Sequence, residues 1–265
     1  MSLAHAGILS PAYIVSGLLV GILVGLTGVG GGSLMTPLLV LLFGFHPSTA
    51  VGTDLLFASV TKSVGTTIHS AGRSVDWKIV GLLATGSIPA TLLTLAVIAH
   101  FGTTSHAVTE MISLVLGAAL LLSAVSLILK DWVLRQALRR NPDFGSHTSI
   151  GLTILVGFVV GVVVSISSVG AGALGTIALF FLYPRLPVIR IVGSDIAHAV
   201  PLTLIAGIGH WYLGAVNFSL LGSLLIGSIP GIILGSFGAR FTPEAYLKPV
   251  LSLVLVLVGL KMLTS

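Results

Sequence analysis

The sequence predicts an all-α, polytopic membrane protein built from two repeats that cross the bilayer in opposite orientations. Three observations predict this fold class. The chain of 265 residues is 55% hydrophobic and only 7% charged, whereas a soluble domain carries roughly 25% charged residues. Several apolar runs approach or exceed the roughly 20 residues that span a hydrocarbon core. Finally, short polar motifs of the first half recur in the same order in the second half.

Short polar joints separate the apolar runs. The first ten residues contain no Lys or Arg, so they lack the basic start of a secretory leader and we expect the first span to be retained. We expect eight to ten transmembrane segments, a count that depends on how deeply the first run of each half enters the membrane. The runs are residues 11–45, 48–70, 77–100, 106–130, 148–183, 190–212, 216–239 and 246–264.

The two halves match in sequence at several ordered positions. Val51-Gly52-Thr53-Asp54 recurs as Val192-Gly193-Ser194-Asp195, and the tetrapeptide Gly-Ser-Ile-Pro occurs at 86–89 and again at 227–230. Ordered motifs in one frame indicate an internal repeat. We therefore divide the chain into a first transmembrane repeat (1–130), a basic cytoplasmic linker (131–147) and a second transmembrane repeat (148–265).

The positions of Lys and Arg predict that the two repeats are inverted. Short cytoplasmic loops are enriched in these residues. The joint at 71–78 holds Arg73 and Lys78, so we expect it to be cytoplasmic. The joint at 183–190, which holds Arg185 and Arg190, corresponds in the repeat to 44–48, which holds neither Lys nor Arg. The net charge of +5 is thus explained by topology, and we expect no nucleic-acid partner.

The first run of each repeat is expected to be a broken helix. Residues 27–33 contain four glycines, and the second copy contains the sequence Ser-Ile-Ser-Ser-Val-Gly-Ala-Gly at 165–172. Three consecutive glycines favour unwinding, because each costs about 1 kcal/mol against Ala inside a helix. The arms of about 15 residues would each reach roughly 20–25 Å. We expect the two breaks to approach each other near the membrane midplane.

An unwound turn followed by a helix is suited to bind an anion. It leaves backbone N–H groups free and presents the positive end of a helix dipole. The hydroxyls of Ser33, Ser167 and Ser168 could then surround one oxyanion with Gly30 to Gly32 and Gly170 to Gly172. Small-residue packing between helices is the alternative explanation of such glycines.

Ionisable residues inside the apolar runs are candidates for binding or proton coupling. Lys62 lies eight residues after Asp54 in one run, so it could attract an anion or pair with that aspartate. Asp54 and Asp195 could equally be helix caps. His198 shares a helix face with Asp195, and His69 matches His210 in the repeat. These histidines could relay protons or lie inert at an interface.

The residues from Gly21 through Gly-Leu-Thr-Gly-Val-Gly-Gly-Gly to Pro37, followed by Ala50-Val51-Gly52-Thr53-Asp54, resemble the TauE/SafE sulfite exporter family. The resemblance covers nearly the whole chain. It implies movement of sulfite, organosulfonates and related small sulfur oxyanions across the bacterial inner membrane. It also implies that Gly30–Gly32, Thr53-Asp54, Gly170–Gly172 and Ser194-Asp195 line a transport path. One departure is Ala171, which stands where the first copy has Gly31.

The residues and the resemblance together predict a secondary transporter of small sulfur-containing oxyanions, with no enzymatic activity. A passive anion channel and a cation transporter that uses the two aspartates are the alternatives. We expect no cofactor and no metal. A proton could be the coupling ion, and the chain could form a homo-oligomer. The substrate-binding candidates are Gly30, Gly31, Gly32, Ser33, Thr53, Lys62, Ser167, Ser168, Gly170, Gly172 and Ser194, and the coupling candidates are Asp54, Asp195, His69, His198 and His210.

Overall fold

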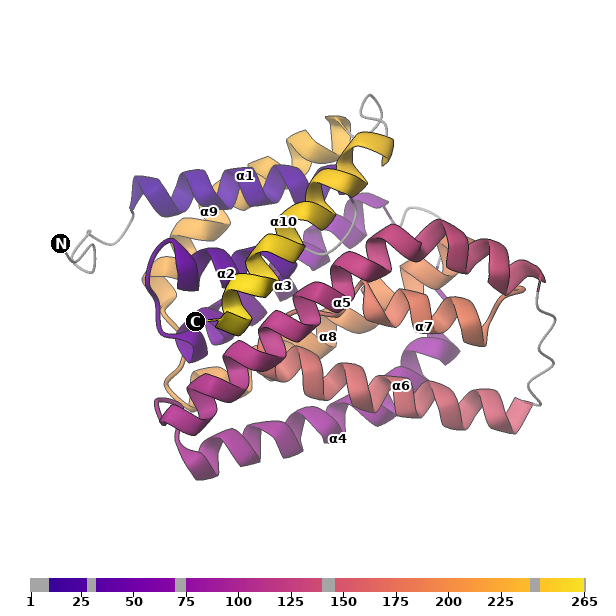
Figure 1. Cartoon of the computed structure of the whole chain (residues 1–265), viewed down its shortest axis with the longest axis horizontal. Coiled ribbons are helices and arrows are strands. Elements are labelled where there is room, and N and C mark those ends of the chain that lie inside the picture. Colours follow the sequence, from indigo (N-terminus) through magenta and orange to yellow (C-terminus); the bar gives the residue numbers. More distant parts are fainter. Residues whose placement is uncertain (1–9, 28–31, 70–74, 140–145, 239–243, 265) are drawn as a thin grey trace.

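The computed structural model describes residues 10–27, 32–69, 75–139, 146–238 and 244–264, and these residues form ten α-helices and no strand (Figure 1). The chain is therefore all-helical in its described part, as the sequence predicts. The helices are α1 (Pro11–Thr27), α2 (Gly32–Leu41), α3 (Pro47–His69), α4 (Trp77–Phe101), α5 (His106–Arg139), α6 (Ser146–Ser167), α7 (Leu174–Leu182), α8 (Val188–Tyr212), α9 (Phe218–Gly238) and α10 (Glu244–Thr264).

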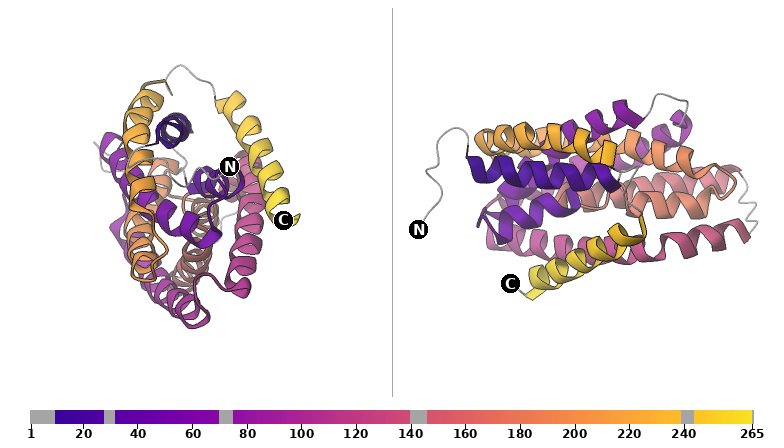
Figure 2. Two further views of the ribbon diagram at one scale, coloured as in Figure 1. Left: turned by 90° about the vertical axis from the view of Figure 1, so that its left-hand side faces the viewer. Right: turned by 90° about the horizontal axis from the view of Figure 1, so that it is seen from above.

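Six of the described helices are long and apolar enough to cross a membrane, namely α4, α5, α6, α8, α9 and α10. Helix α1 is a shorter apolar helix. The helices run roughly along one common direction in the right-hand view of Figure 2. Large apolar side chains such as Leu93, Phe237 and Leu257 are exposed on the outer helices, where a soluble protein would carry polar groups. The protein is accordingly a multi-pass membrane protein.

Three helices differ in length from what the sequence predicts. Helix α6 has 22 residues and is about 33 Å long at 1.5 Å per residue, so it is a full span and not an arm of about 15 residues. Helix α7 has only nine residues. Helix α5 continues to Arg139, well into the segment 131–147 that we interpreted as a linker. That stretch is rich in Leu, Arg, Gln and Ala, which favour helix, and it contains no Gly or Pro before Arg139.

The helices pack as four principal pairs, α1 with α9, α4 with α6, α3 with α8 and α5 with α10. In Figures 1 and 2 α10 lies on the outside beside α5, and α1 lies beside α9. Helices α3 and α8 each also contact several of the other helices. They therefore occupy the interior of the bundle, where side chains are shielded from lipid.

Glycines allow the close approach of α1 and α9. Each helix carries three glycines spaced four residues apart, which lie on one face, and a Cβ atom added at any of them would collide with the backbone of the partner helix. Such faces let membrane helices approach closely enough for strong van der Waals packing. Gly86 of α4 and Gly157 and Gly161 of α6 play the same part in the α4–α6 pair. The α1–α9 glycines are Gly17, Gly21 and Gly25 on α1 and Gly227, Gly231 and Gly235 on α9.

Candidate functional site

Asp54 lies on α3 in the interior of the bundle and is fully buried. The α2 residue Thr36 binds it twice. The Thr36 hydroxyl donates a hydrogen bond to Asp54 Oδ2, and the Thr36 backbone N–H donates to the same oxygen over 3.2 Å. The Ser168 hydroxyl lies beside the carboxyl, although neither Ser168 Oγ nor Asp54 Oδ1 forms a well-aligned hydrogen bond among the described residues.

Asp195 occupies the corresponding position on α8 and is also fully buried. The hydroxyl of Thr176, on α7, lies 2.7 Å from Asp195 Oδ2 and 2.8 Å from the carbonyl oxygen of Gly172. The carboxyl presses against the backbone of α7 at Gly175, where a Cβ atom would collide with Asp195 Oδ1. Each aspartate thus has a threonine partner on the short helix that precedes it in the chain.

Lys62 joins the two aspartates into one cluster. It lies on α3, about two turns after Asp54, and only 6% of its surface is exposed. Its ammonium group donates a hydrogen bond of 3.1 Å to the carbonyl oxygen of Ala171, and it interacts electrostatically with both Asp54 and Asp195. A buried charge is stable only when it is paired or hydrogen-bonded, so these three side chains depend on one another. We call Asp54, Lys62 and Asp195 the central cluster.

The connection between α6 and α7 provides the backbone wall of the central cluster. Residues 168–173 are not helical. Gly170 and Gly172 have φ angles of 111° and 110°, a region that glycine adopts without steric cost, and Ser168 has a φ angle of 60°. At the end of α6, the Ser167 hydroxyl donates to the carbonyl oxygen of Val163 over 2.7 Å. The structure therefore brings Ser168 and the Gly170–Gly172 segment to Lys62 and Asp54.

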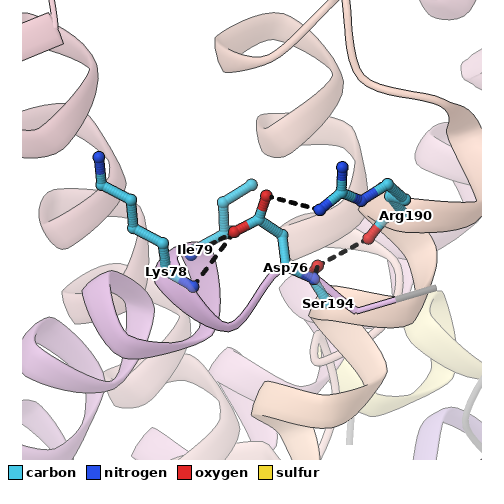
Figure 3. A network of polar contacts seen from close by, with 5 residues as sticks. All are labelled: Asp76, Lys78, Ile79, Arg190 and Ser194. Atoms are coloured by element: carbon cyan, nitrogen blue, oxygen red, sulfur yellow. Dashed lines mark hydrogen bonds and ion pairs between the residues drawn. The ribbon is translucent and has the colours of Figure 1, made fainter. Parts of the chain in front are cut away.

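Thr53 and Ser194 make different contacts from the aspartates that follow them in sequence. Ser194 Oγ accepts a hydrogen bond of 2.8 Å from the backbone N–H of Asp76 and donates one to the carbonyl oxygen of Arg190. Figure 3 shows this network, in which Asp76 also caps α4 and forms an ion pair of 3.2 Å with Arg190. Thr53 Oγ1 accepts a hydrogen bond of 3.0 Å from the backbone N–H of Asn217. These hydroxyls hold the starts of α4 and α9, and a role in substrate binding stays a prediction for both.

The two described histidines of α8 are buried and bonded through their Nε2 atoms. His198 Nε2 lies 2.8 Å from Ser87 Oγ of α4, and His198 is close enough to Lys62 for an electrostatic interaction. His210 Nε2 lies 2.9 Å from the carbonyl oxygen of Ser165. Because a carbonyl oxygen only accepts, His210 carries a proton on Nε2.

The remaining predicted residues lie partly outside the description. Gly30 and Gly31 are outside the described residues, so the first glycine break and its distance from the second are not placed. Gly32 begins α2 and His69 ends α3, and the side chains of Ser33 and His69 are not among those described. The described residues contain no group of three or more His, Cys, Asp or Glu side chains that could hold a metal ion.

Sequence reasoning missed the two threonines that bind the aspartates. Their signal was available, because the frame that aligns Leu34 with Leu174 also aligns Thr36 with Thr176. It also missed Ser87, Thr91 and Ser165, three buried hydroxyl residues of α4 and α6. A single hydroxyl in an apolar run carries little information by itself, because Ser and Thr commonly bond to their own helix backbone.

The bundle and its central cluster define a class of protein. Ionisable residues buried among membrane helices mark pathways for ions, substrates or protons, and here they lie where the interior helices α3 and α8 meet a helix interruption. These features are typical of secondary transporters.

The chain belongs to the TauE/SafE sulfite exporter family, because the model described as "Sulfite exporter TauE/SafE" matches residues 13–262. Among its relatives is the probable membrane transporter protein YjnA of Bacillus subtilis, which is 40% identical over 258 residues, 96% of this chain and 100% of the relative. Probable membrane transporter protein YdhB of the same organism is 27% identical over 92% of this chain and 96% of its own length.

Probable membrane transporter protein MJ0441 of Methanocaldococcus jannaschii is 24% identical over 97% of this chain and 96% of its own length. No solved structure matches the chain. The protein is thus a membrane transporter of the TauE/SafE family, and its full-length relatives carry the names of transporters, not enzymes.

Proposed function

We propose that the protein is a secondary transporter that moves small sulfur oxyanions, of the sulfite or organosulfonate class, together with protons. The observation that carries this proposal is the position of Lys62, a buried ammonium group that interacts with two buried carboxyls and reaches the α6–α7 connection. The name of the family, sulfite exporter, supports the substrate class.

The charge of the central cluster links anion binding to protons. When all three side chains are ionised, Asp54, Asp195 and Lys62 carry one net negative charge, which would repel an anion from a site that water cannot screen. One proton makes the cluster neutral, and a second makes it positive. An oxyanion that binds beside Lys62 is therefore favoured when the carboxyls take up protons, so protons and anion travel together.

The hydrogen bonds of Thr176 support a protonated carboxyl. Thr176 has one hydroxyl proton but lies within hydrogen-bond distance of two acceptors, the carbonyl oxygen of Gly172 and Asp195 Oδ2. Both bonds are made together when Thr176 donates to the carbonyl and Asp195 supplies the second proton. The neutral acid is thus accommodated without moving any described side chain.

The oxyanion is proposed to bind between Lys62 and the start of α7. Ala173, at the N-cap of α7, gives the helix no side-chain cap, and the Asp195 carboxyl lies against the first turn of α7 at Gly175 and Thr176. When Asp195 is protonated, the positive end of α7 is available to attract the negative charge of the oxyanion instead. The ammonium group of Lys62 already bonds to Ala171 in this connection. Ser168 lies beside Asp54 at the same connection and supplies a further hydroxyl.

We also propose that residues 1–130 and 148–265 are inverted repeats that rock against each other around this site. Two kinds of contact support this. The Ser194–Asp76 and Thr53–Asn217 hydrogen bonds are the same contact with the repeats exchanged, because one offset relates Thr53 to Ser194 and Asp76 to Asn217. The pairs α1–α9 and α6–α4 are likewise equivalent under that exchange.

The first experiment is a thermal-stability screen of the detergent-purified protein with sulfite, sulfate, thiosulfate, sulfoacetate, nitrate and chloride. A ligand at 100 times its Kd adds about 2.7 kcal/mol to the stability of the folded state. We expect one sulfur oxyanion to stabilise the protein selectively, Lys62→Gln to abolish that effect, and Lys78→Gln to retain it. Lys78 is a matched control because it is an exposed lysine at the start of α4.

Each alternative function has its own signature in reconstituted liposomes. Sulfite flux that carries no protons and follows the membrane potential alone would indicate a passive anion channel. Stabilisation by Na⁺ or divalent cations, with no response to any anion, would indicate a cation transporter that uses Asp54 and Asp195. An undiminished sulfite response in Lys62→Gln would remove the proposed site.

A further inference from the structure

A set of buried polar side chains leads from the central cluster toward the C-terminal end of α8. His198 lies one turn after Asp195 on α8 and contacts Ser87 of α4. Thr91 follows Ser87 by one turn of α4, and its Oγ1 accepts a hydrogen bond of 3.0 Å from Ser165 Oγ of α6. The backbone carbonyl of Ser165 in turn holds His210, two residues before the end of α8.

These side chains are enclosed by protein, and two of their polar atoms lack a hydrogen-bond partner among the described residues. Ser87, Thr91, Ser165 and His210 are fully buried, and only 1% of the surface of His198 is exposed. The Nδ1 atoms of His198 and His210 are buried without a hydrogen-bond partner among the described residues. A buried polar nitrogen without a partner is costly unless water or an ion binds it. These two atoms mark places where water would be bound along the path.

The first repeat is apolar at the two positions that correspond to His198 and Thr91. The offset that relates Asp54 to Asp195 places Phe57 opposite His198, and it places Ile232 opposite Thr91. Phe57 and Ile232 are both buried, and they belong to one hydrophobic cluster with Val20, Val24 and Leu39. Ser228, which corresponds to Ser87, donates to the Leu225 carbonyl of its own helix. The two repeats therefore differ in their polar lining at these two positions, whereas His69, whose side chain is not among those described, matches His210.

We propose that protons reach the central cluster from the end of the molecule at which α8 ends. They move along a water-assisted path lined by His210, Ser165, Thr91, Ser87 and His198. In the other repeat, Phe57 and Ile232 close the equivalent path. A hydronium ion at the end of the path gives its proton to the Asp195 carboxylate, which leaves a carboxylic acid and a water molecule. This inference rests on the proposed proton-coupled function and gives the proton route a direction.

The groups that face the path restrict which side chains can hold the proton. On α3 they are Lys62 and Asp54, and on α8 they are Asp195 and the two histidines. Helix α7 has no titratable side chain, and α4 and α6 carry theirs only near their ends. The hydroxyls can pass a proton on but not keep it, so the proton is delivered to a carboxyl of the central cluster.

The test uses the full chain in liposomes loaded with the pH dye pyranine, with sulfite as the driving anion. We expect Ser87→Ala and Thr91→Val to slow sulfite-coupled proton movement about a hundredfold, the lower end of what a positioned proton-transfer group contributes. Both variants should keep the thermal stabilisation by sulfite, because neither residue contacts the proposed anion site. His198→Phe, which copies Phe57, should act in the same direction.

Ser228→Ala is the matched control, because it removes the equivalent hydroxyl from the other repeat, and its proton movement should stay within twofold of the wild type. Wild-type rates in Ser87→Ala and Thr91→Val, or equal losses in Ser228→Ala, would overturn the path while leaving the coupled function intact. Sulfite flux without protons in the wild type would instead reject the coupled function and the path with it.

Discussion

At the scale of single residues, one lysine of the central cluster is the shared counterion of two buried carboxyls. Burying a charge is costly, and breaking a buried pair by removing one partner typically costs 3–5 kcal/mol, because the other charge stays behind. Lys62 is the group that both Asp54 and Asp195 share. Substitutions at the three residues should therefore have coupled effects on the stability of the protein, whatever the transported anion.

The first prediction concerns this coupling. Lys62→Met should lower the thermal stability of the purified protein, because two buried carboxyls lose their shared counterion. Adding Asp195→Asn to Lys62→Met should restore part of the loss, because one of the two uncompensated charges is removed. The measurement is a double-mutant cycle of unfolding temperatures. Strictly additive effects would contradict the coupling that the structure indicates.

The second prediction distinguishes the hydrogen bond of the Thr176 hydroxyl from the packing of the Thr176 methyl group. Thr176→Val should destabilise the protein by about 1–3 kcal/mol, the usual cost of leaving a buried polar group without its hydrogen-bond partner, because the Asp195 carboxyl loses the Thr176 hydroxyl. Thr176→Ser should cost less, since the hydroxyl remains. Thermal unfolding in detergent checks both variants. Equal losses in the two would show that the methyl group, not the hydrogen bond, stabilises this position.

At the scale of elements, glycine faces explain which helices pair. The α1–α9 contact joins two faces with glycine at every fourth position, and the backbones approach so closely that no side chain fits between them. Van der Waals packing is a principal force between apolar helices in lipid, because lipid is as apolar as the helices themselves. These glycines are thus as important to the fold as a leucine core is to a soluble bundle.

The third prediction tests that contact. Gly231→Leu on α9 should reduce protein yield and unfolding temperature, because its Cβ would press on the backbone of α1 at Leu18 and Gly21, which cannot move aside. Overpacking of this kind costs typically 1–3 kcal/mol and occasionally more. Gly222→Leu on the same helix is the control, since no atom lies within 4 Å of its Cβ position. Equal yields would show that the α1–α9 pair tolerates separation.

Much of the element list could be predicted from the sequence, and the exceptions have physical causes. Hydropathy located the spans, because lipid requires long apolar runs. It misplaced the end of α5, because a charged stretch of good helix formers looks like a linker when only polarity is considered. It also took α6 for a short arm, because residues 165–167, which are hydroxyl-rich, remain helical and the interruption begins only at Ser168.

The candidate site could be predicted only in part, for a different reason. Aspartate and lysine stand out in an apolar run, so Asp54, Asp195 and Lys62 were found. Which hydroxyls face them depends on how each short helix packs against the helix that follows it, and sequence periodicity does not report this. Thr53 and Ser194, the nearest hydroxyls in sequence, bind the starts of α9 and α4. Thr36 and Thr176, which precede the aspartates by 18 and 19 residues, bind the carboxyls.

At the scale of the whole molecule, α4 and α8 run in the same direction. Asp76 and Arg190, just before α4 and in the first turn of α8, form an ion pair (Figure 3), and near the other ends Gly209 packs against Leu95. The joint after α4 and the joint after α8 therefore lie at one end of the bundle. The basic residues predict that this end is external and that the end with Asp76 and Arg190 is cytoplasmic.

The fourth prediction tests this orientation, and the chain is well suited to it because it contains no cysteine. Single cysteines at the exposed positions Lys78 and Ile189 should react with a membrane-impermeant maleimide only from the cytoplasmic side of sealed vesicles. Single cysteines at Thr104 and Tyr212, also exposed, should react only from the external side. Labelling of Lys78→Cys and Tyr212→Cys from one side would contradict the arrangement of α4 and α8.

The α1–α9 pair has a consequence for synthesis of the chain. The ribosome must add about 200 further residues after α1 before its partner face on α9 is complete, which takes about 10 to 40 s at roughly 5–20 residues per second. During that time the glycine face of α1 has no matching surface in its own chain. We expect α1 to spend this interval against the insertion machinery or lipid, and the bundle to close only when the ninth helix enters the membrane.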